Sequence, residues 1–100
     1  MAIDVFVYSD LDAPALAAAA DEALGGPAQV IVVGPALPVS AMSAEIAREN
    51  GVAITPRSYL VARFDKERMA ESREETARLL ARIGARGGVS ALADGERPYT

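Results

Sequence analysis

The sequence contains no histidine and no cysteine, and Lys66 is its only lysine. It therefore lacks the usual zinc ligands, the base of a Ser-His-Asp triad, and a cysteine nucleophile. No G-x-x-x-x-G-K-[ST] motif surrounds Lys66, which excludes a P-loop nucleotide site. Any catalysis in this chain has to rest on carboxylates, hydroxyl groups or arginine, and we predict no cofactor and no bound metal.

Long apolar runs and a strongly basic region are also missing. No run of apolar residues is long enough to span a bilayer, and the N-terminus lacks the pattern of a signal peptide, so we expect a cytoplasmic protein without a membrane segment. The net charge is −4, and residues 1–50 hold seven acidic residues against one basic residue. Nucleic-acid binding is not expected because such proteins usually carry a basic face. The uneven charge permits contact with a partner or a second copy through opposite charges.

The order of apolar and helix-forming segments predicts one domain that spans residues 1–100. Strand-like and helix-like segments alternate over the first half of the chain, which is typical of a sheet with helices on its faces. We therefore predict an α/β fold: a small three-layer sandwich with a mostly parallel sheet of about four strands, flavodoxin-like or TIR-like. The expected strands are 3–8, 29–33, 52–54 and 59–64, and the expected helices are 15–24, 40–50 and 65–85.

The stretch 28–54 is the centre of this prediction. Its first part, residues 29–33, is the β-branched run QVIVV, which is typical of a strand buried on both faces of a parallel sheet. Ser40 is a suitable N-cap for the helix that follows. That helix is expected to turn Met42, Ile46 and Ala47 inward, and to complete a strand–helix–strand crossover.

The helix at 65–85 carries an apolar stripe at helical spacing. Packing of this stripe on the sheet is one interpretation, and a self-association seam along residues 66–84 is the other. The stripe consists of Met69, Ser72, Thr76, Leu79, Leu80 and Ile83.

The strand at 59–64 is either a hairpin partner of residues 52–55 or a separate edge strand, and as an edge strand it is a second candidate for homo-oligomer contact. Residues 89–92 are a candidate for a short final strand. Residues 94–100 read as a frayed tail.

The candidate ligand-binding residues are Tyr8, Asp10, Asp12, Ser40 and Arg57. Asp10 and Asp12 follow the first strand, where ligands bind in open parallel sheets, and their oxygens suit Mg²⁺. The alternative for Asp12 is a cap on the helix that begins near Pro14. Arg57 lies near two hydroxyl residues and could bind a phosphate or carboxylate group. The alternative is that Arg57 is an exposed residue of a proline-containing turn.

Glu45 is the one candidate catalytic residue. The segment from Ser40 to Ile46, with Gly51 and Ile54 after it, resembles the D-S-G-T-x-x-E-[IL] helix and following G-[KR]-P-[VI] of nucleoside 2-deoxyribosyltransferase-like families and their TIR relatives. This resemblance implies a glutamate that attacks or stabilises the anomeric carbon of a nucleoside or of NAD. It also implies that Tyr8 stacks on a base and that Asp10 or Asp12 binds ribose hydroxyls. Val39, Ala41 and Met42 replace the Asp, Gly and Thr of the motif.

Two functions follow from these observations. The first is a small soluble α/β protein that binds a nucleotide-like ligand or a protein partner without catalysis. The second is a nucleosidase or transferase for nucleosides or NAD that uses Glu45. The first is preferred, because a catalytic site usually needs more convergent polar groups than these.

Overall fold

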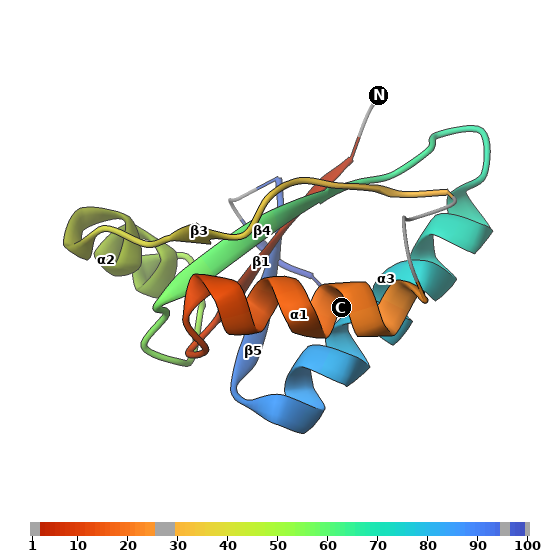
Figure 1. Ribbon diagram of the computed structural model, residues 1–100. Coiled ribbons are helices and arrows are strands. Elements are labelled where there is room, and N and C mark those ends of the chain that lie inside the picture. Colours follow the sequence, from red (N-terminus) through yellow and green to blue (C-terminus); the bar gives the residue numbers. More distant parts are fainter. Residues whose placement is uncertain (1–2, 26–29, 95–96, 100) are drawn as a thin grey trace.

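The computed structural model describes residues 3–25, 30–94 and 97–99. A single sheet carries two long helices on one face, and a short third helix lies at one end (Figure 1). The elements in chain order are β1 (Asp4–Ser9), α1 (Ala13–Leu24), β2 (Val32–Val33), β3 (Leu37–Pro38), α2 (Ala41–Glu49), β4 (Ser58–Arg63), α3 (Met69–Arg86), β5 (Val89–Ala93) and β6 (Arg97–Pro98).

All neighbouring strands of this sheet are antiparallel. The strand order is β2-β4-β1-β5-β6, and β3 also pairs with β4. The predicted mostly parallel, three-layer, flavodoxin-like or TIR-like sandwich is therefore wrong. The chain instead forms two layers in which β1-α1-β2 and β4-α3-β5 are split βαβ units, the arrangement of ferredoxin-like folds.

The physical reason for this error is that local sequence does not reveal which strands are neighbours. β1 and β2 both run antiparallel to β4, so they point the same way, but β4 lies between them. In the same way, β1 lies between β4 and β5. A strand–helix–strand segment has the same pattern whether its two strands touch or enclose a third, antiparallel one.

The main core lies between the sheet and the helices α1 and α3. Alternation along β1 turns Val5, Val7 and Ser9 toward the helices, and all three are fully buried. Small residues of α1, such as Ala19 and Ala20, allow the helix to approach the sheet closely. We call this side of the sheet the inner face.

The edge next to β4 is one interrupted strand rather than a buried central one. β2 and β3 pair with successive parts of β4: Val33 pairs with Ala62, and Leu37 pairs with Tyr59. The edge therefore has one residue more between its two paired positions than β4 has, as in a β-bulge. Pro35 and Pro38 cannot donate to a sheet, which suits an edge. Of the predicted buried strand at 29–33, residue 29 lies outside the described residues, and among residues 30–33 only Val32 and Val33 form a strand, at the edge of the sheet. Residues 52–54 form no strand.

The two candidate seams for self-association are used inside the molecule. β4 pairs on both sides, so the expected edge strand at 59–64 is a central strand. The stripe of α3 packs inward, because Thr76, Leu79 and Ile83 are fully buried. These positions cannot form an interface with a second copy, and the packing interpretation of the stripe is confirmed.

The end of the chain also differs from the prediction. The short strand expected at 89–92 exists as β5, but it pairs with β1 inside the sheet. β6 pairs with β5, and the ring of Tyr99 lies edge-on to Phe64 with centroids 6.1 Å apart. Within the described residues of 94–100, the expected frayed tail is thus a paired edge.

Replacement of Thr76 by valine is expected to stabilise the protein by about 1 kcal/mol, because its buried Oγ1 has no hydrogen-bond partner among the described residues. Valine has nearly the same shape and removes the desolvated hydroxyl group. Urea denaturation of both proteins measures the difference. Thr76→Ser, which keeps the hydroxyl and removes the methyl group, is the control and should destabilise. A valine variant less stable than the parent would contradict this reasoning.

Candidate protein-binding surface

The face of the sheet away from α1 and α3, here called the outer face, is built from cross-strand pairs of large side chains. Tyr8 lies opposite Tyr59, and their rings stack with centroids 5.8 Å apart. Partial burial and the neighbouring Tyr59 raise the pKa of Tyr8 above its ordinary value. Two rows further on this face, Asp4 pairs with Arg63, whose Nε donates to Asp4 Oδ1 at 2.9 Å. These contacts make the outer face an ordered, largely aromatic platform.

Helix α2 covers only one part of the outer face. Ala47 is buried and packs with Val52 and Leu92 against Phe6 and Tyr8. The residue of α2 that packs against the sheet is therefore the small Ala47, and the large apolar residues of the helix are exposed to solvent.

The prediction that Met42 and Ile46 point inward is accordingly wrong, whereas Ala47 is buried as expected. Met42 is 73% exposed and Ile46 is 52% exposed. The two residues are four apart, so they share one side of α2.

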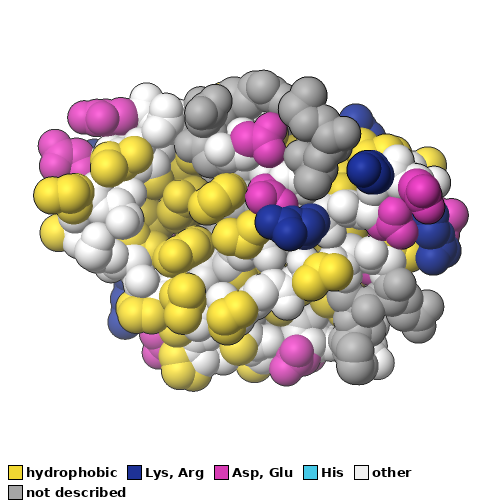
Figure 2. All heavy atoms as spheres, turned by 90° about the horizontal axis from the view of Figure 1, so that it is seen from above, with side chains coloured by type: hydrophobic (Ala, Val, Ile, Leu, Met, Phe, Trp, Pro, Cys, Tyr) yellow, Lys and Arg dark blue, Asp and Glu magenta, His cyan; other side chains and the backbone are white. Residues whose placement is uncertain are grey.

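The exposed large apolar side chains of the described residues lie on α2 and on the sheet edge formed by β2 and β3, and we call these residues the outer apolar surface. Leu37 lies beside Tyr59 on the outer face, and Val32 lies beside Arg63. Figure 2 shows that hydrophobic side chains gather over the α2 end of this face, with charged side chains at the rim of that end, in the middle of the face and at the opposite end. Apolar patches of this kind mark interaction sites on soluble proteins. The residues of the surface are Val32, Leu37, Met42 and Ile46.

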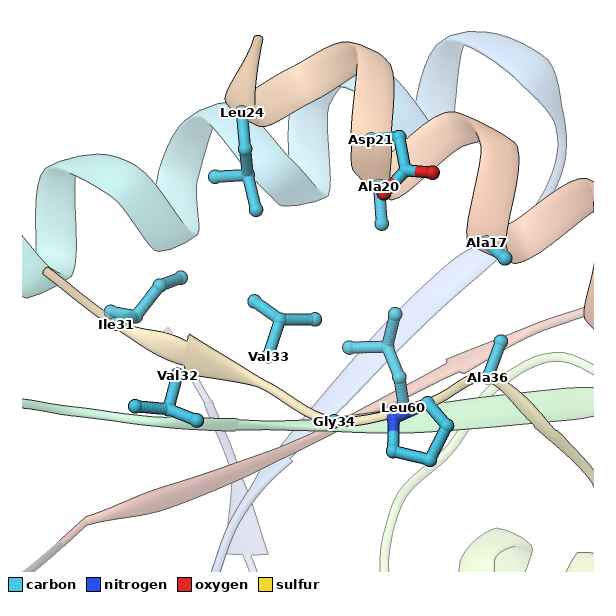
Figure 3. A pocket seen from close by; sticks show the side chains of 11 residues that line it. Ala17, Ala20, Asp21, Leu24, Ile31, Val32, Val33, Gly34, Ala36 and Leu60 are labelled. Atoms are coloured by element: carbon cyan, nitrogen blue, oxygen red, sulfur yellow. The ribbon is translucent and has the colours of Figure 1, made fainter. Parts of the chain in front are cut away.

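A second feature lies at the edge of the sheet, on its inner side. A groove of about 370 Å³ runs between α1 and the segment 31–36. In Figure 3, Ala20 and Leu24 of α1 face Ile31 and Val33 across the groove. Asp21 is the only charged residue among the described residues that line it.

Three of the candidate ligand-binding residues have contacts that hold the fold together. The N–H of Gly88 donates to Asp10 Oδ1 at 2.7 Å, and a side chain on Gly88 would meet that carboxylate at 2.8 Å. Asp12 caps α1 by accepting from the N–H of Ala15 at 2.9 Å. Ser40 caps α2 by accepting from the N–H of Ser43 at 3.1 Å.

Replacement of Asp12 by alanine is expected to lower the free energy of unfolding by about 1 kcal/mol, because α1 would lose its N-terminal cap. Chemical denaturation measures this loss. Asp12→Ser keeps a capping oxygen and is the matched control, with most of the stability retained. Equal stability of the alanine variant and the parent would show that the cap contributes nothing measurable.

The remaining candidates lie on separate parts of the molecule. Glu45 is exposed on α2 and lines a shallow depression with Arg48 and Glu49, and neither Asp10 nor Asp12 belongs to it. Arg57 is exposed in the loop before β4, where its backbone carbonyl accepts from Val39. The contacts found here do not bring Asp10, Asp12 and Glu45 together. A binding or catalytic role for these residues stays a prediction.

Within 3–25, 30–94 and 97–99, no group of three or more acidic residues is arranged to hold a metal ion. No helix among those residues is sufficiently long and apolar to cross a bilayer. Among the described residues, the features that stand out are thus the outer apolar surface and the adjoining groove.

Sequence reasoning missed both of these features. The β-branched run that contains Val32 predicts a buried strand, and the helix pattern predicts that Met42 and Ile46 point inward. The prolines at 35 and 38 were a usable signal, because a strand that carries proline belongs at an edge and not in the interior.

Comparison with solved structures decides the class of fold. A chain of the "CdiA-CT/CdiI toxin and immunity complex from Burkholderia pseudomallei" superimposes with a TM-score of 0.81, covering 98% of this chain and 97% of that one. The two chains share one fold. They are 20% identical in sequence, so the likeness concerns the fold alone. No protein-family model matches the sequence, and no curated protein matches it.

This comparison and the antiparallel sheet overturn the suggested resemblance to nucleoside 2-deoxyribosyltransferase-like and TIR-like domains. A Rossmann-like nucleotide site needs parallel neighbouring strands whose carboxyl ends meet at one rim. Every neighbouring pair of strands here is antiparallel. The expectation of a nucleotide-like ligand is therefore wrong, because the architecture from which it was inferred is absent among the described residues.

Proposed function

We propose that this protein is an immunity-type binding protein, which holds a toxin-type protein partner in a complex without catalysing a reaction. The observation that carries this proposal is the likeness of fold, over nearly the full length of both chains, to a chain from a toxin and immunity complex. An immunity protein acts by occupying its partner, so it needs a complementary surface rather than a set of reacting groups.

The outer apolar surface supports this role. Its exposed side chains come from both the sheet edge and α2, and Leu37 lies opposite Tyr59, whose ring stacks on that of Tyr8. Apolar and aromatic residues held in fixed positions are typical of the centre of protein interfaces. The Ser40 cap and the packed Ala47 fix α2, so little conformational freedom would be lost on binding.

The test is co-expression of this chain with each protein encoded by the genes next to its own. If the proposal is right, one of these proteins inhibits growth when it is expressed alone, and this chain restores growth. The two proteins should then elute together, with the mass of a complex by light scattering. If no neighbouring protein is both toxic and bound, the immunity-type function is wrong.

A further inference from the structure

The groove between α1 and the sheet edge has the dimensions and walls of a pocket for a side chain. Its volume of about 370 Å³ lies at the small end of the range for ligand sites. Ala17 and Leu24 line it from α1, and Val33 and Leu60 line it from the sheet. In Figure 3 these side chains project into the space between the two layers.

The groove carries one negative charge that the protein does not neutralise. Asp21 is exposed to solvent, and within the described part of the chain its carboxylate makes no hydrogen bond and no ion pair. Its neighbour Glu22, by contrast, is paired with Arg86. The occupant that complements this groove is therefore an apolar stem that ends in a cation.

The groove also adjoins the outer apolar surface. Val32 lines the groove and is itself 67% exposed. In Figure 3, Val33 points toward α1 while Val32 points to the other side of the strand. A partner that covers the outer apolar surface can thus reach the groove around the edge formed by β2.

We propose that the groove accepts an arginine side chain of the protein partner, with its guanidinium group on Asp21 and its stem along Leu24 and Val33. This inference rests on the proposed function and names the chemistry of the partner. Arginine suits this place better than lysine for two reasons. Its guanidinium is more weakly hydrated than an ammonium group, so partial burial costs less, and its planar fork matches a carboxylate.

The experiment is a two-dimensional ¹H–¹⁵N NMR titration of the full chain with N-acetyl-L-arginine amide. The neutral isostere N-acetyl-L-citrulline amide is the matched probe. We expect the arginine compound to shift the backbone amides of residues 17–24 and 31–36, and the citrulline compound to bind at least about fivefold more weakly. Asp21→Asn should reduce the affinity for the arginine compound by a similar factor. Glu22→Gln, which removes the same charge one residue away, should leave that affinity within about twofold.

Three results would overturn the inference: no shifts in residues 17–24 and 31–36, equal binding of the two probes, or equal loss in both variants. Equal binding of the probes would indicate a purely apolar occupant. Because these titrations use no protein partner, they succeed or fail separately from the immunity-type function. If the protein binds arginine specifically but co-expression finds no toxin-type partner, the arginine pocket is supported and the immunity-type function is wrong.

Discussion

Replacement of Ile46 by glutamate is expected to weaken binding of the toxin-type partner by at least about thirtyfold, which corresponds to roughly 2 kcal/mol or more. Ile46 is 52% exposed on α2 and belongs to the outer apolar surface, so burial of a carboxylate there in a complex leaves an unpaired charge. Stability should change by less than about 0.5 kcal/mol, because the side chain faces solvent in the free protein. Isothermal titration calorimetry with the partner found by co-expression measures the affinity, and urea denaturation measures the stability.

The control for this variant has to change the net charge equally, since an acidic protein attracts a basic partner at long range. Arg82→Gln lowers the net charge by one unit, as Ile46→Glu does. Arg82 lies on the helix layer, where it lines a depression with Ala23 and Arg78, away from the outer face. It should bind the partner within about twofold of the parent. If the two variants bind alike, the outer apolar surface is not the interface.

Replacement of Leu79 by alanine is expected to lower the free energy of unfolding by about 2–5 kcal/mol, the largest stability effect we predict. Leu79 is fully buried in the core between α3 and the sheet, so truncation removes apolar contacts and leaves a cavity. Domains of this size have total stabilities of roughly 5–15 kcal/mol, and the melting temperature should fall by at least about 8 °C. Thermal unfolding followed by circular dichroism gives this value.

Leu37→Ala removes the same number of atoms from the surface. Leu37 is 43% exposed on β3, so its truncation should change stability by less than about 0.5 kcal/mol. The same variant should nevertheless weaken partner binding, because Leu37 belongs to the outer apolar surface. A comparable loss of stability in the two variants would show that the sheet edge contributes as much to the fold as the core does.

Local chemistry in the sequence accounts for several elements and their ends. Asp12 and Pro14 predict the start of α1, and Ser40 predicts the start of α2, because caps act within one turn of the helix. The stripe of α3 identifies the face of that helix that packs in the core. Each of these features depends on residues a few positions apart, which a sequence displays directly.

The functional surface could not be predicted in the same way. Helix α2 has apolar residues on more than one side, and the sequence favours burial of the larger ones. Of the three residues expected to point inward, the structure buries only Ala47, which packs beside Leu92 where α2 meets the outer face. Whether Met42 and Ile46 are core or interface is therefore set by the distance between α2 and a sheet formed by other parts of the chain.

By itself, the sequence determined the helices α1, α2 and α3 and the strands β1, β4 and β5 through local signals, and it excluded histidine, cysteine and P-loop chemistry. Only the tertiary structure decided the antiparallel order of the strands, the exposed apolar surface and the groove at Asp21. The physical reason is that strand pairing joins residues far apart in the chain, such as Tyr8 with Tyr59 and Val5 with Ala93. Such pairings reflect the free energy of the whole packed domain, whereas caps and periodicity reflect only neighbouring residues.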